Sequence, residues 1–185
     1  MGEPMEIKVI LLGDIRVGKT SIINQFILNK FENEVPFTIT SSYLDKSIFF
    51  PDFGKSILFH IWDTSGSEKY RSLLKIFFKE SKVVILVYDI TNKSSFESIY
   101  FWYNMAKELI VDKPIFVVIG NKKDLFIKEV VCEEEGRKFA NEIGAIFQLI
   151  SSKNYDEILS LFNKIGEAIF NSEYEKEMKK KHEIL

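Results

Sequence analysis

A short glycine-containing loop near the amino terminus constrains this chain most. The apolar run Ile7–Leu12 is followed by Gly13-Asp14-Ile15-Arg16-Val17-Gly18-Lys19-Thr20, which matches the pattern G-x-x-x-x-G-K-T. In such a loop backbone N–H groups surround phosphate oxygens, the lysine reaches the β- and γ-phosphates, and the last hydroxyl can bind Mg²⁺. The match lies between a predicted strand and a predicted helix, as the motif requires. The sequence therefore predicts a nucleoside-triphosphate site whose phosphate contacts come from Arg16, Val17, Gly18, Lys19, Thr20 and Ser21.

Length and charge narrow the class of protein. The 185 residues fit one domain that is large enough to bury a core. Lys and Arg total 25 and Asp and Glu total 27, so the formal net charge is −2. No overall basic field is therefore present to draw the chain onto nucleic acid. We expect a single domain over residues 1–178 and a short charged tail over residues 179–185.

The cysteine content and the amino terminus predict an intracellular protein. Cys132 is the single cysteine, so no internal disulfide can form, which suits a reducing compartment. It precedes Glu133 at the predicted start of a helix, and we interpret it as a capping position rather than a reactive thiol. Residues 1–6 lack the features of a secretory signal, and no apolar run is long enough to cross a membrane. We expect a cytoplasmic protein that is at most peripheral at cytosolic membrane faces.

Short apolar runs alternate with longer amphipathic stretches along the chain. The predicted strands are Ile7–Leu12, Ile57–Trp62, Val83–Tyr88, Ile115–Ile119 and Ala145–Ile150. The predicted helices are Thr20–Asn29, Ser67–Lys79, Ser95–Leu109, Glu133–Ile143 and Tyr155–Lys176. Continuous apolar runs of this length suit strands that are buried on both faces. The alternation predicts an α/β fold with a six-stranded, mostly parallel sheet and helices on both faces.

One antiparallel hairpin is expected within this sheet. The turn-rich segment Pro51-Asp52-Phe53-Gly54 separates the strand-like runs Ser47–Phe50 and Lys55–Trp62. His60 alternates along the second of these runs. We therefore expect a structural rather than a catalytic role for this histidine.

Two signals concern helix ends. Ser94 and Glu97 have the spacing of a capping box, which predicts the start of the middle helix. Glu173–Leu185 is highly charged, and we interpret it as the frayed end of the last helix.

Polar segments follow several predicted strands. Asp63-Thr64-Ser65-Gly66 follows the second strand, where the carboxylate can hold Mg²⁺ through water and the glycine N–H can face a γ-phosphate. Asn121-Lys122-Lys123-Asp124 and Ser151-Ser152-Lys153 follow the last two strands. Open α/β sheets bind ligands at the carboxyl ends of their strands. These segments and the phosphate-binding loop are therefore expected to form one site.

With these motifs in this order, the chain resembles the Ras superfamily of small GTPases, whose set is a P-loop, a switch threonine, D-T-A-G, N-K-x-D and S-A-K. The resemblance covers essentially the whole chain and is greatest to the Rab branch, over Trp62–Leu73 and Val87–Asn92. The short segment between Asp124 and Glu133 has no room for a Rho-type insertion, and no Arf-type amino-terminal helix precedes the first strand. The resemblance implies a P-loop NTPase small G domain that binds GTP or GDP with Mg²⁺.

The resemblance also implies how guanine would be recognised. Asp124 would accept hydrogen bonds from guanine N1–H and N2–H₂, which adenine does not offer in that arrangement. Lys122 would cover one face of the base, and Phe31 would stack at its other edge. The remaining residues of the predicted purine site are Asn121, Ser151, Ser152 and Lys153.

At the phosphate end, the resemblance implies a metal site and a γ-phosphate sensor. Thr20 and Thr38 would bind Mg²⁺ directly, and Asp63 would hold it through water. The residues expected to take part in hydrolysis are Lys19, Thr38, Gly66 and Ser67, the last standing where the family has a glutamine.

Partner proteins are implied by the same resemblance. Exchange factors and effectors would bind through the switch regions of a monomeric protein. Tyr43, Trp62 and Phe77 occupy the positions of the aromatic triad with which Rab proteins contact effectors. Each of them could instead be a core residue, and the sequence does not decide between the two.

Several positions depart from the family pattern. Ser67 is too short to orient the attacking water as glutamine does, so hydrolysis should be slow. Ile15 stands where the loop usually has a small residue and would crowd an arginine finger. Arg16 could fold back on the phosphates or point to solvent, and we favour solvent. Thr40 and Ser41–Ser42 replace the run that follows the switch threonine in Rab proteins, so effector identity cannot be transferred. Ser65 replaces the alanine of D-T-A-G.

The carboxyl terminus differs as well. Rab proteins normally end in prenylated cysteines, whereas this chain ends His182-Glu183-Ile184-Leu185. Lys179-Lys180-Lys181 attracts anionic lipid by ~1 kcal/mol per charge, which does not anchor a protein stably. We expect that the sequence is trimmed or that partners bring the protein to membranes.

The sequence thus predicts a Rab-like GTP/GDP switch with weak intrinsic hydrolysis, acting in vesicle traffic. One alternative is a pseudo-GTPase that holds nucleotide as an interaction module without turning it over. A P-loop kinase of small metabolites is the other alternative, but it gives no account of Asn121-Lys122-Lys123-Asp124.

Overall fold

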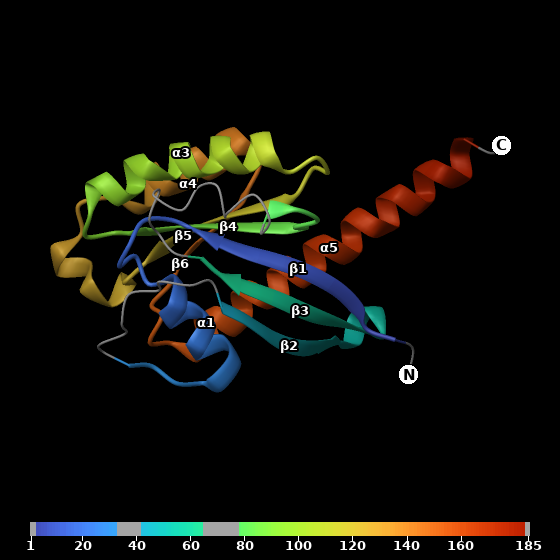
Figure 1. Cartoon of the computed structure of the whole chain (residues 1–185), viewed down its shortest axis with the longest axis horizontal. Coiled ribbons are helices and arrows are strands. Elements are labelled where there is room, and N and C mark those ends of the chain that lie inside the picture. Colours follow the sequence, from blue (N-terminus) through green and yellow to red (C-terminus); the bar gives the residue numbers. More distant parts are fainter. Residues whose placement is uncertain (1–2, 33–41, 65–77, 184–185) are drawn as a thin grey trace.

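The computed structural model describes residues 3–32, 42–64 and 78–183, and it has the predicted α/β architecture. Its six strands form one sheet in the order β2-β3-β1-β4-β5-β6 (Figure 1). The strands are β1 (Met5–Leu12), β2 (Ser42–Phe50), β3 (Lys55–Asp63), β4 (Val83–Asp89), β5 (Ile115–Asn121) and β6 (Ile146–Leu149). All neighbouring pairs are parallel except β2 and β3. The prediction of a mostly parallel six-stranded sheet is confirmed.

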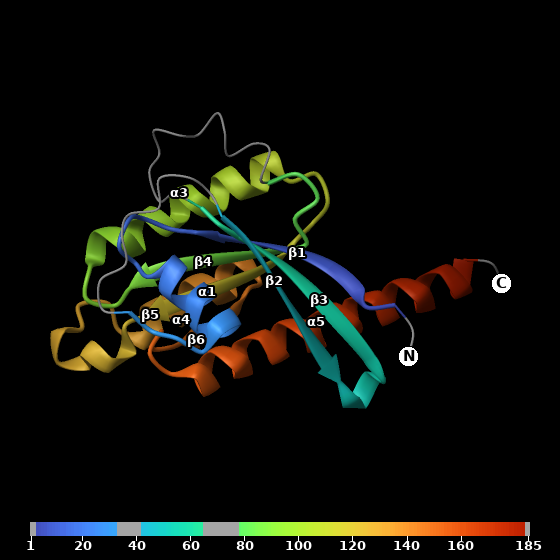
Figure 2. The same ribbon diagram turned by 60° about the horizontal axis from the view of Figure 1, so that its bottom comes forward.

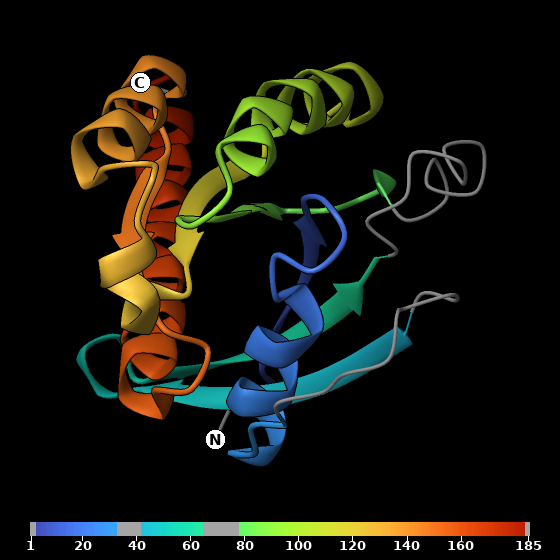
Figure 3. The same cartoon turned by 90° about the vertical axis from the view of Figure 1, so that its left-hand side faces the viewer.

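Helices cover both faces of this sheet. They are α1 (Lys19–Leu28), α3 (Lys93–Leu109), α4 (Glu133–Ile143) and α5 (Tyr155–Glu183), with 3-10 turns η1 (Pro51–Phe53) and η3 (Lys123–Lys128). Val9 and Leu11 of β1 belong to the same buried cluster as Phe26 of α1 and Phe162 of α5. The alternate residues Ile10 and Leu12 belong to a second cluster with Trp102 of α3 and Phe139 of α4. Thus α1 and α5 lie on one face and α3 and α4 on the other (Figures 1 and 3).

The predicted hairpin is confirmed. β2 and β3 pair antiparallel from Ser42↔Asp63 to Phe50↔Lys55, and η1 joins them at the far end of the ribbon (Figure 2). Pro51 begins the turn with its fixed φ, and Gly54 ends it at φ 59°, a left-handed conformation that glycine adopts at little cost. His60 lies within β3, where Nδ1 is 2.9 Å from Asp45 Oδ1 and 2.5 Å from the Tyr43 hydroxyl.

The predicted capping box of the middle helix is wrong. α3 begins at Lys93 and its N-cap is Asn92, whose side-chain oxygen accepts a hydrogen bond from Ser95 N at 3.2 Å. Ser95 Oγ in turn donates to Asn92 O at 2.7 Å. An asparagine two residues earlier thus caps the helix through the Ser95 N–H, and Ser94 lies inside the helix. At α4, by contrast, Cys132 is the N-cap as predicted, and its backbone N–H donates to Glu135 Oε2 at 3.1 Å.

The last helix is longer than predicted. α5 continues to Glu183 rather than ending at Lys176, and its last turns extend beyond the sheet (Figure 2). The charged stretch consists largely of Glu, Lys and Met, which are strong helix formers, and Lys176 pairs with Glu173 at 2.7 Å one turn earlier. High charge was therefore a poor indicator of fraying here.

No helix in the described part of the chain is long and apolar enough to cross a membrane. The helix predicted over Ser67–Lys79 lies mostly outside the described residues.

A glycine in α5 lies directly beneath the hairpin. A Cβ atom at Gly166 would come within 2.0 Å of Phe50 Cζ. The Phe50 ring is 5% exposed and packs edge-on against Phe170 with ring centroids 5.4 Å apart, so it has little space to move.

Gly166→Ala should therefore lower the free energy of unfolding by about 1–3 kcal/mol, as overpacking does. In a helix with space at this position, the same change would raise the free energy of unfolding by up to about 1 kcal/mol. Urea unfolding measures the difference. When Phe50→Leu is also present, Gly166→Ala should lower the free energy of unfolding by less than it does in the otherwise unaltered protein. A more stable Gly166→Ala single variant would contradict this packing.

Candidate functional site

The loop between β1 and α1 has a backbone shape that suits anion binding. Gly13, Arg16 and Gly18 have positive φ angles of 148°, 68° and 99°. Residues with positive φ that alternate with residues of ordinary φ turn the neighbouring backbone N–H groups toward one concave side, as in phosphate-binding loops. A Cβ at Gly13 would lie 2.2 Å from Val87 O, and one at Gly18 would lie 2.2 Å from Asn121 Nδ2. Only glycine fits at both positions. Arg16 is exposed, and it holds a left-handed conformation that costs a residue with a Cβ about 1–2 kcal/mol.

Lys19 begins α1 and is almost completely buried, with 6% of its surface exposed. Its ammonium donates to Gly13 O at 2.7 Å and to Asp14 O at 2.9 Å. Burial lowers the pKa of Lys19 to about 8, although the nearby carboxylates of Asp63 and Asp14 act in the opposite direction. A lysine ammonium has three N–H donors, and these two carbonyls accept from two of them. The third can donate to an anion in the loop.

Thr20 and Asp63 meet at the ends of α1 and β3. The Thr20 hydroxyl donates to Asp63 Oδ2 at 2.5 Å, and Asp63 is 2% exposed. The parallel pairing Leu11↔Asp63 brings the carboxylate beside the phosphate-binding loop, and Thr64 Oγ1 donates to Leu11 O at 2.6 Å. Hydroxyl and carboxylate oxygens are ligands that Mg²⁺ prefers. Among the described residues no group of three or more His, Cys, Asp and Glu side chains could hold a metal ion.

Asn121 connects three loops at the end of β5. Its Nδ2 donates to Val17 O at 2.8 Å, and its Oδ1 accepts from Ser152 N at 3.0 Å. The residue has 0% exposure, so both ends of a fully buried amide are satisfied by backbone groups. The loops that follow β1, β5 and β6 are thereby held against one another.

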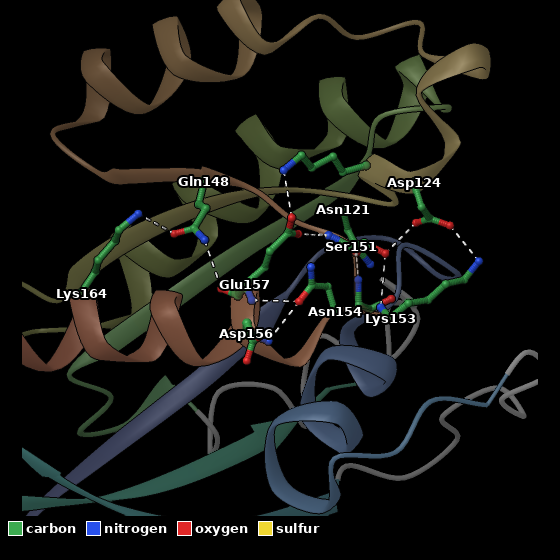
Figure 4. Close-up of polar contacts among 11 residues, drawn as sticks. Asn121, Asp124, Gln148, Ser151, Lys153, Asn154, Asp156, Glu157 and Lys164 are labelled. Atoms are coloured by element: carbon green, nitrogen blue, oxygen red, sulfur yellow. Dashed lines mark hydrogen bonds and ion pairs between the residues drawn. The ribbon is translucent and has the colours of Figure 1, made fainter.

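Asp124 lies at the start of η3 and is held by the loop after β6 (Figure 4). Oδ1 accepts from Ser151 Oγ at 2.7 Å, and Oδ2 accepts from Lys153 Nζ at 2.7 Å. Burial acts to raise the pKa of this carboxyl, but the hydrogen bonds from Lys153 and Ser151 outweigh it, and the pKa is lowered. Asp124 is thus a carboxylate acceptor that stays charged well below neutral pH.

Helix α5 positions this loop. Asn154 Oδ1 caps the helix by accepting from the N–H groups of Asp156 and Glu157 at 3.0 and 3.3 Å (Figure 4). Glu157 Oε2 accepts from Ser151 N at 2.8 Å, and Lys123 pairs with the other oxygen at 2.9 Å. The cap and the first turn of α5 therefore fix the loop that holds Asp124.

A cavity of about 610 Å³ opens beside these groups. It is lined by Asp124, Ser151 and Lys153 from the strand ends and by Gln25, Asn29 and Tyr155 from α1 and α5, among others. The Lys153 ammonium also lies 5.5 Å from the centre of the Phe31 ring. Its volume lies in the range of small-molecule sites, and the residues that line it are mostly polar.

One contributor was missed by the sequence analysis. Asp89 ends β4, is 6% exposed, and pairs with Lys122 at 2.6 Å. Lys122 itself has a left-handed φ of 66°, so the ion pair orients its side chain at an unusual backbone position. The rule that directed attention to the ends of the other strands would also have found Asp89, since it follows the buried run Val83–Tyr88.

Most of the predicted site residues therefore gather at one edge of the sheet. The described members are Arg16, Val17, Gly18, Lys19, Thr20, Ser21, Phe31, Asp63, Asn121, Lys122, Asp124, Ser151, Ser152 and Lys153. Thr38, Gly66 and Ser67 lie outside the described residues, as does Phe77.

The loop, its buried lysine and the strand-end groups define a P-loop nucleotide-binding protein of the α/β class. The sequence model of the Ras family matches residues 8–171, which is most of the chain. The chain therefore belongs to the Ras family, and it is a small GTPase that binds guanine nucleotides and acts as a GTP/GDP switch.

The lowered pKa of Lys19 predicts a pH dependence of stability. Below about pH 8 the amine is charged in both states, and its burial opposes folding. Between about pH 8 and pH 10.5 the unfolded chain binds more protons than the folded protein does. The titration of Lys19 therefore makes the free energy of unfolding rise with pH in this range. Between pH 7 and pH 10, nucleotide-free protein should gain roughly 2 kcal/mol of unfolding free energy relative to Lys19→Met, which lacks the amine. Parallel pH curves for the two proteins in urea unfolding would show that Lys19 titrates normally.

Proposed function

We propose that this small GTPase is a Rab-type switch that hydrolyses GTP slowly and acts in intracellular vesicle traffic. The observation that carries the Rab assignment is a cross-strand aromatic pair, with one exposed and one half-buried ring, beside the nucleotide site. Tyr43 of β2 is 44% exposed, and its ring centroid lies 5.0 Å from that of Trp62 on β3. The two residues are cross-strand neighbours in the register Tyr43↔Trp62. The exposure of Tyr43 supports a partner surface, whereas Trp62 is half-buried and packs against the core cluster that contains Ile10 and Trp102.

The proposed base recognition rests on the Asp124 carboxylate. Its two oxygens are acceptors, and Ser151 and Lys153 keep it ionised. Guanine offers two adjacent donors, N1–H and N2–H₂, to such a pair of acceptors, whereas adenine does not offer donors in that arrangement. Lys122 and Phe31 would flank the ring, and Asn121 with the backbone of Ser152 would complete the site.

The proposed phosphate recognition uses the loop N–H groups, Lys19 and a metal ion. Thr20, Thr38 and Asp63 would hold Mg²⁺, which neutralises phosphate charge when it is bound. Lys19 carries its charge in a water-poor position, where its attraction to phosphate oxygens is greater than in solvent.

Slow hydrolysis follows from two positions. Ser67 cannot extend an amide to the attacking water, and Gly66 supplies only a backbone N–H to the γ-phosphate. Ile15 is 49% exposed at the mouth of the loop, where its branched side chain would obstruct an arginine finger. Both features favour a GTP-bound state of long duration.

Partners would read this state through the switch regions, together with Tyr43, Trp62 and Phe77. Exchange factors and effectors are the classes expected of a monomeric switch. Trp62 also has the Lys8 ammonium 5.3 Å from its ring centre, so a basic group already lies at the border of the proposed surface.

Removing the base-recognising carboxylate should abolish guanine selectivity. Asp124→Ala should weaken GDP binding by two orders of magnitude or more, because charge-assisted hydrogen bonds contribute about 1.5–3 kcal/mol each. Titration calorimetry with GDP and ADP measures both affinities. Asp112→Ala is the matched control, since Asp112 is an exposed carboxylate that pairs with Lys82 at 3.0 Å. Equal affinity of the unaltered protein for GDP and ADP would refute the assignment and would favour the kinase alternative.

Restoring the missing amide should accelerate hydrolysis. Ser67→Gln should raise the single-turnover rate of preloaded GTP on the order of 10²-fold, the scale of a well-placed acid-base or water-orienting group. Ser67→Ala is the control and should remain as slow as the unaltered protein. Adding Ile15→Gly to Ser67→Gln should create sensitivity to an arginine-finger activator.

The same assay separates the slow switch from the pseudo-GTPase. A slow but measurable rate that rises in Ser67→Gln supports the switch. No hydrolysis in either protein supports the pseudo-GTPase. An unaltered protein that is as fast as Ser67→Gln would contradict the proposed role of Ser67.

A further inference from the structure

A hydrogen bond joins a buried indole of α3 to the phosphate-binding loop. The indole N–H of Trp102 donates to Asp14 Oδ1 at 2.9 Å, across 88 residues of sequence. Trp102 is 1% exposed and is packed in the cluster that also contains Phe96, Ile99 and Ala106. A buried indole N–H needs an acceptor, and here the acceptor is the second residue of the loop.

Asp14 carries a second contact on its main chain. Its carbonyl oxygen accepts from Lys19 Nζ at 2.9 Å, while its carboxylate accepts from Trp102. The two contacts lie on the same residue, so the orientation of Asp14 affects both of them. The neighbouring Gly13 supplies the other acceptor of Lys19 and has a backbone that only glycine fits. The position of the lysine therefore depends on a short loop segment that Trp102 holds from the side.

We propose that Trp102 is a positioning residue for nucleotide retention. Through Asp14 it holds the first turn of the loop in the shape that keeps the Lys19 ammonium directed into it. The proposal rests on the binding of guanine nucleotide by this family, and it adds a residue from α3 that none of the loop or strand-end motifs contains. The indole contributes through its N–H, beyond the apolar packing of its rings, because the carboxylate acceptor is charged.

A purely structural role for Trp102 would predict a different pattern. In that case any comparable weakening of the α3 core would loosen the nucleotide to the same extent. Ile99 is the matched position, because it lies on the same helix, has 0% exposure and packs in the same cluster, but does not touch the loop through a hydrogen bond. Ile99→Val removes one methylene from this core.

The first experiment measures the release of a fluorescent GDP analogue from Mg²⁺-loaded protein in the presence of excess GDP. Trp102→Phe keeps an aromatic ring and removes the N–H, and it should release the analogue about tenfold faster than the unaltered protein. Ile99→Val should release it within about twofold of the unaltered rate. Equal acceleration in both variants, or none in Trp102→Phe, would overturn the proposal.

A double-mutant cycle tests the route through Asp14. Asp14→Asn keeps a side-chain oxygen acceptor and should release nucleotide within about threefold of the unaltered rate. Asp14→Leu has a similar shape but no acceptor, and it should match Trp102→Phe. Combining Trp102→Phe with Asp14→Leu should add little to either single change, because both remove the same bond. Additive effects on the release rate would overturn the proposed route.

A second measurement needs no nucleotide. Acetic anhydride labels exposed amines, and mass spectrometry reports the labelling rate of Lys19 in nucleotide-free protein. The rate should rise several-fold in Trp102→Phe and stay unchanged in Ile99→Val. An unchanged rate in Trp102→Phe would overturn the positioning of Lys19. If the labelling responds but the unaltered protein fails to bind GDP, the assignment as a guanine-nucleotide switch fails while the positioning contact stands.

Discussion

The buried amide of Asn121 is the interaction on which the rest of the site depends. It sits at the end of β5, donates to the loop after β1 and accepts from the loop after β6. Each contact satisfies a backbone group that would otherwise be buried without a partner, at a cost of about 1–3 kcal/mol. Because the amide lies so close to Gly18, that position cannot carry a side chain. One side chain thus sets the distance between the phosphate-binding loop and the loop that holds Asp124.

Around this connection the site contains groups that oppose folding. Lys19 is charged and buried, and Arg16 holds a left-handed backbone conformation. These features lower the stability of the protein without nucleotide, whereas a bound polyphosphate would compensate the buried charge of Lys19. Strain and buried charge are commonly found where function requires them. The hydrogen bond from Trp102 holds Asp14, the residue whose carbonyl accepts from the Lys19 ammonium.

The fold and most of the site could be predicted, because their signals are local in sequence. Buried strands read as continuous apolar runs, and the phosphate-binding loop and Asn121-Lys122-Lys123-Asp124 are contiguous motifs. Helix ends were predicted less well. Asn92 and Ser94 are both good caps, and α3 uses the first of them. The charge of the last segment suggested fraying, but its residues have high helix propensity, and α5 continues to Glu183.

The sequence by itself determined that this chain forms an α/β sheet, carries a phosphate-binding loop and belongs among guanine-nucleotide switches. These properties follow from residue type and short spacings. The tertiary structure alone decided which distant side chains meet. Pairings such as Trp102 with Asp14 and Lys122 with Asp89 join residues whose spacing carries no periodic signal, because they meet only after strands and helices have packed into layers. The burial of Lys19, and with it the lowered pKa, was likewise decided by packing, since desolvation depends on every neighbour that excludes water.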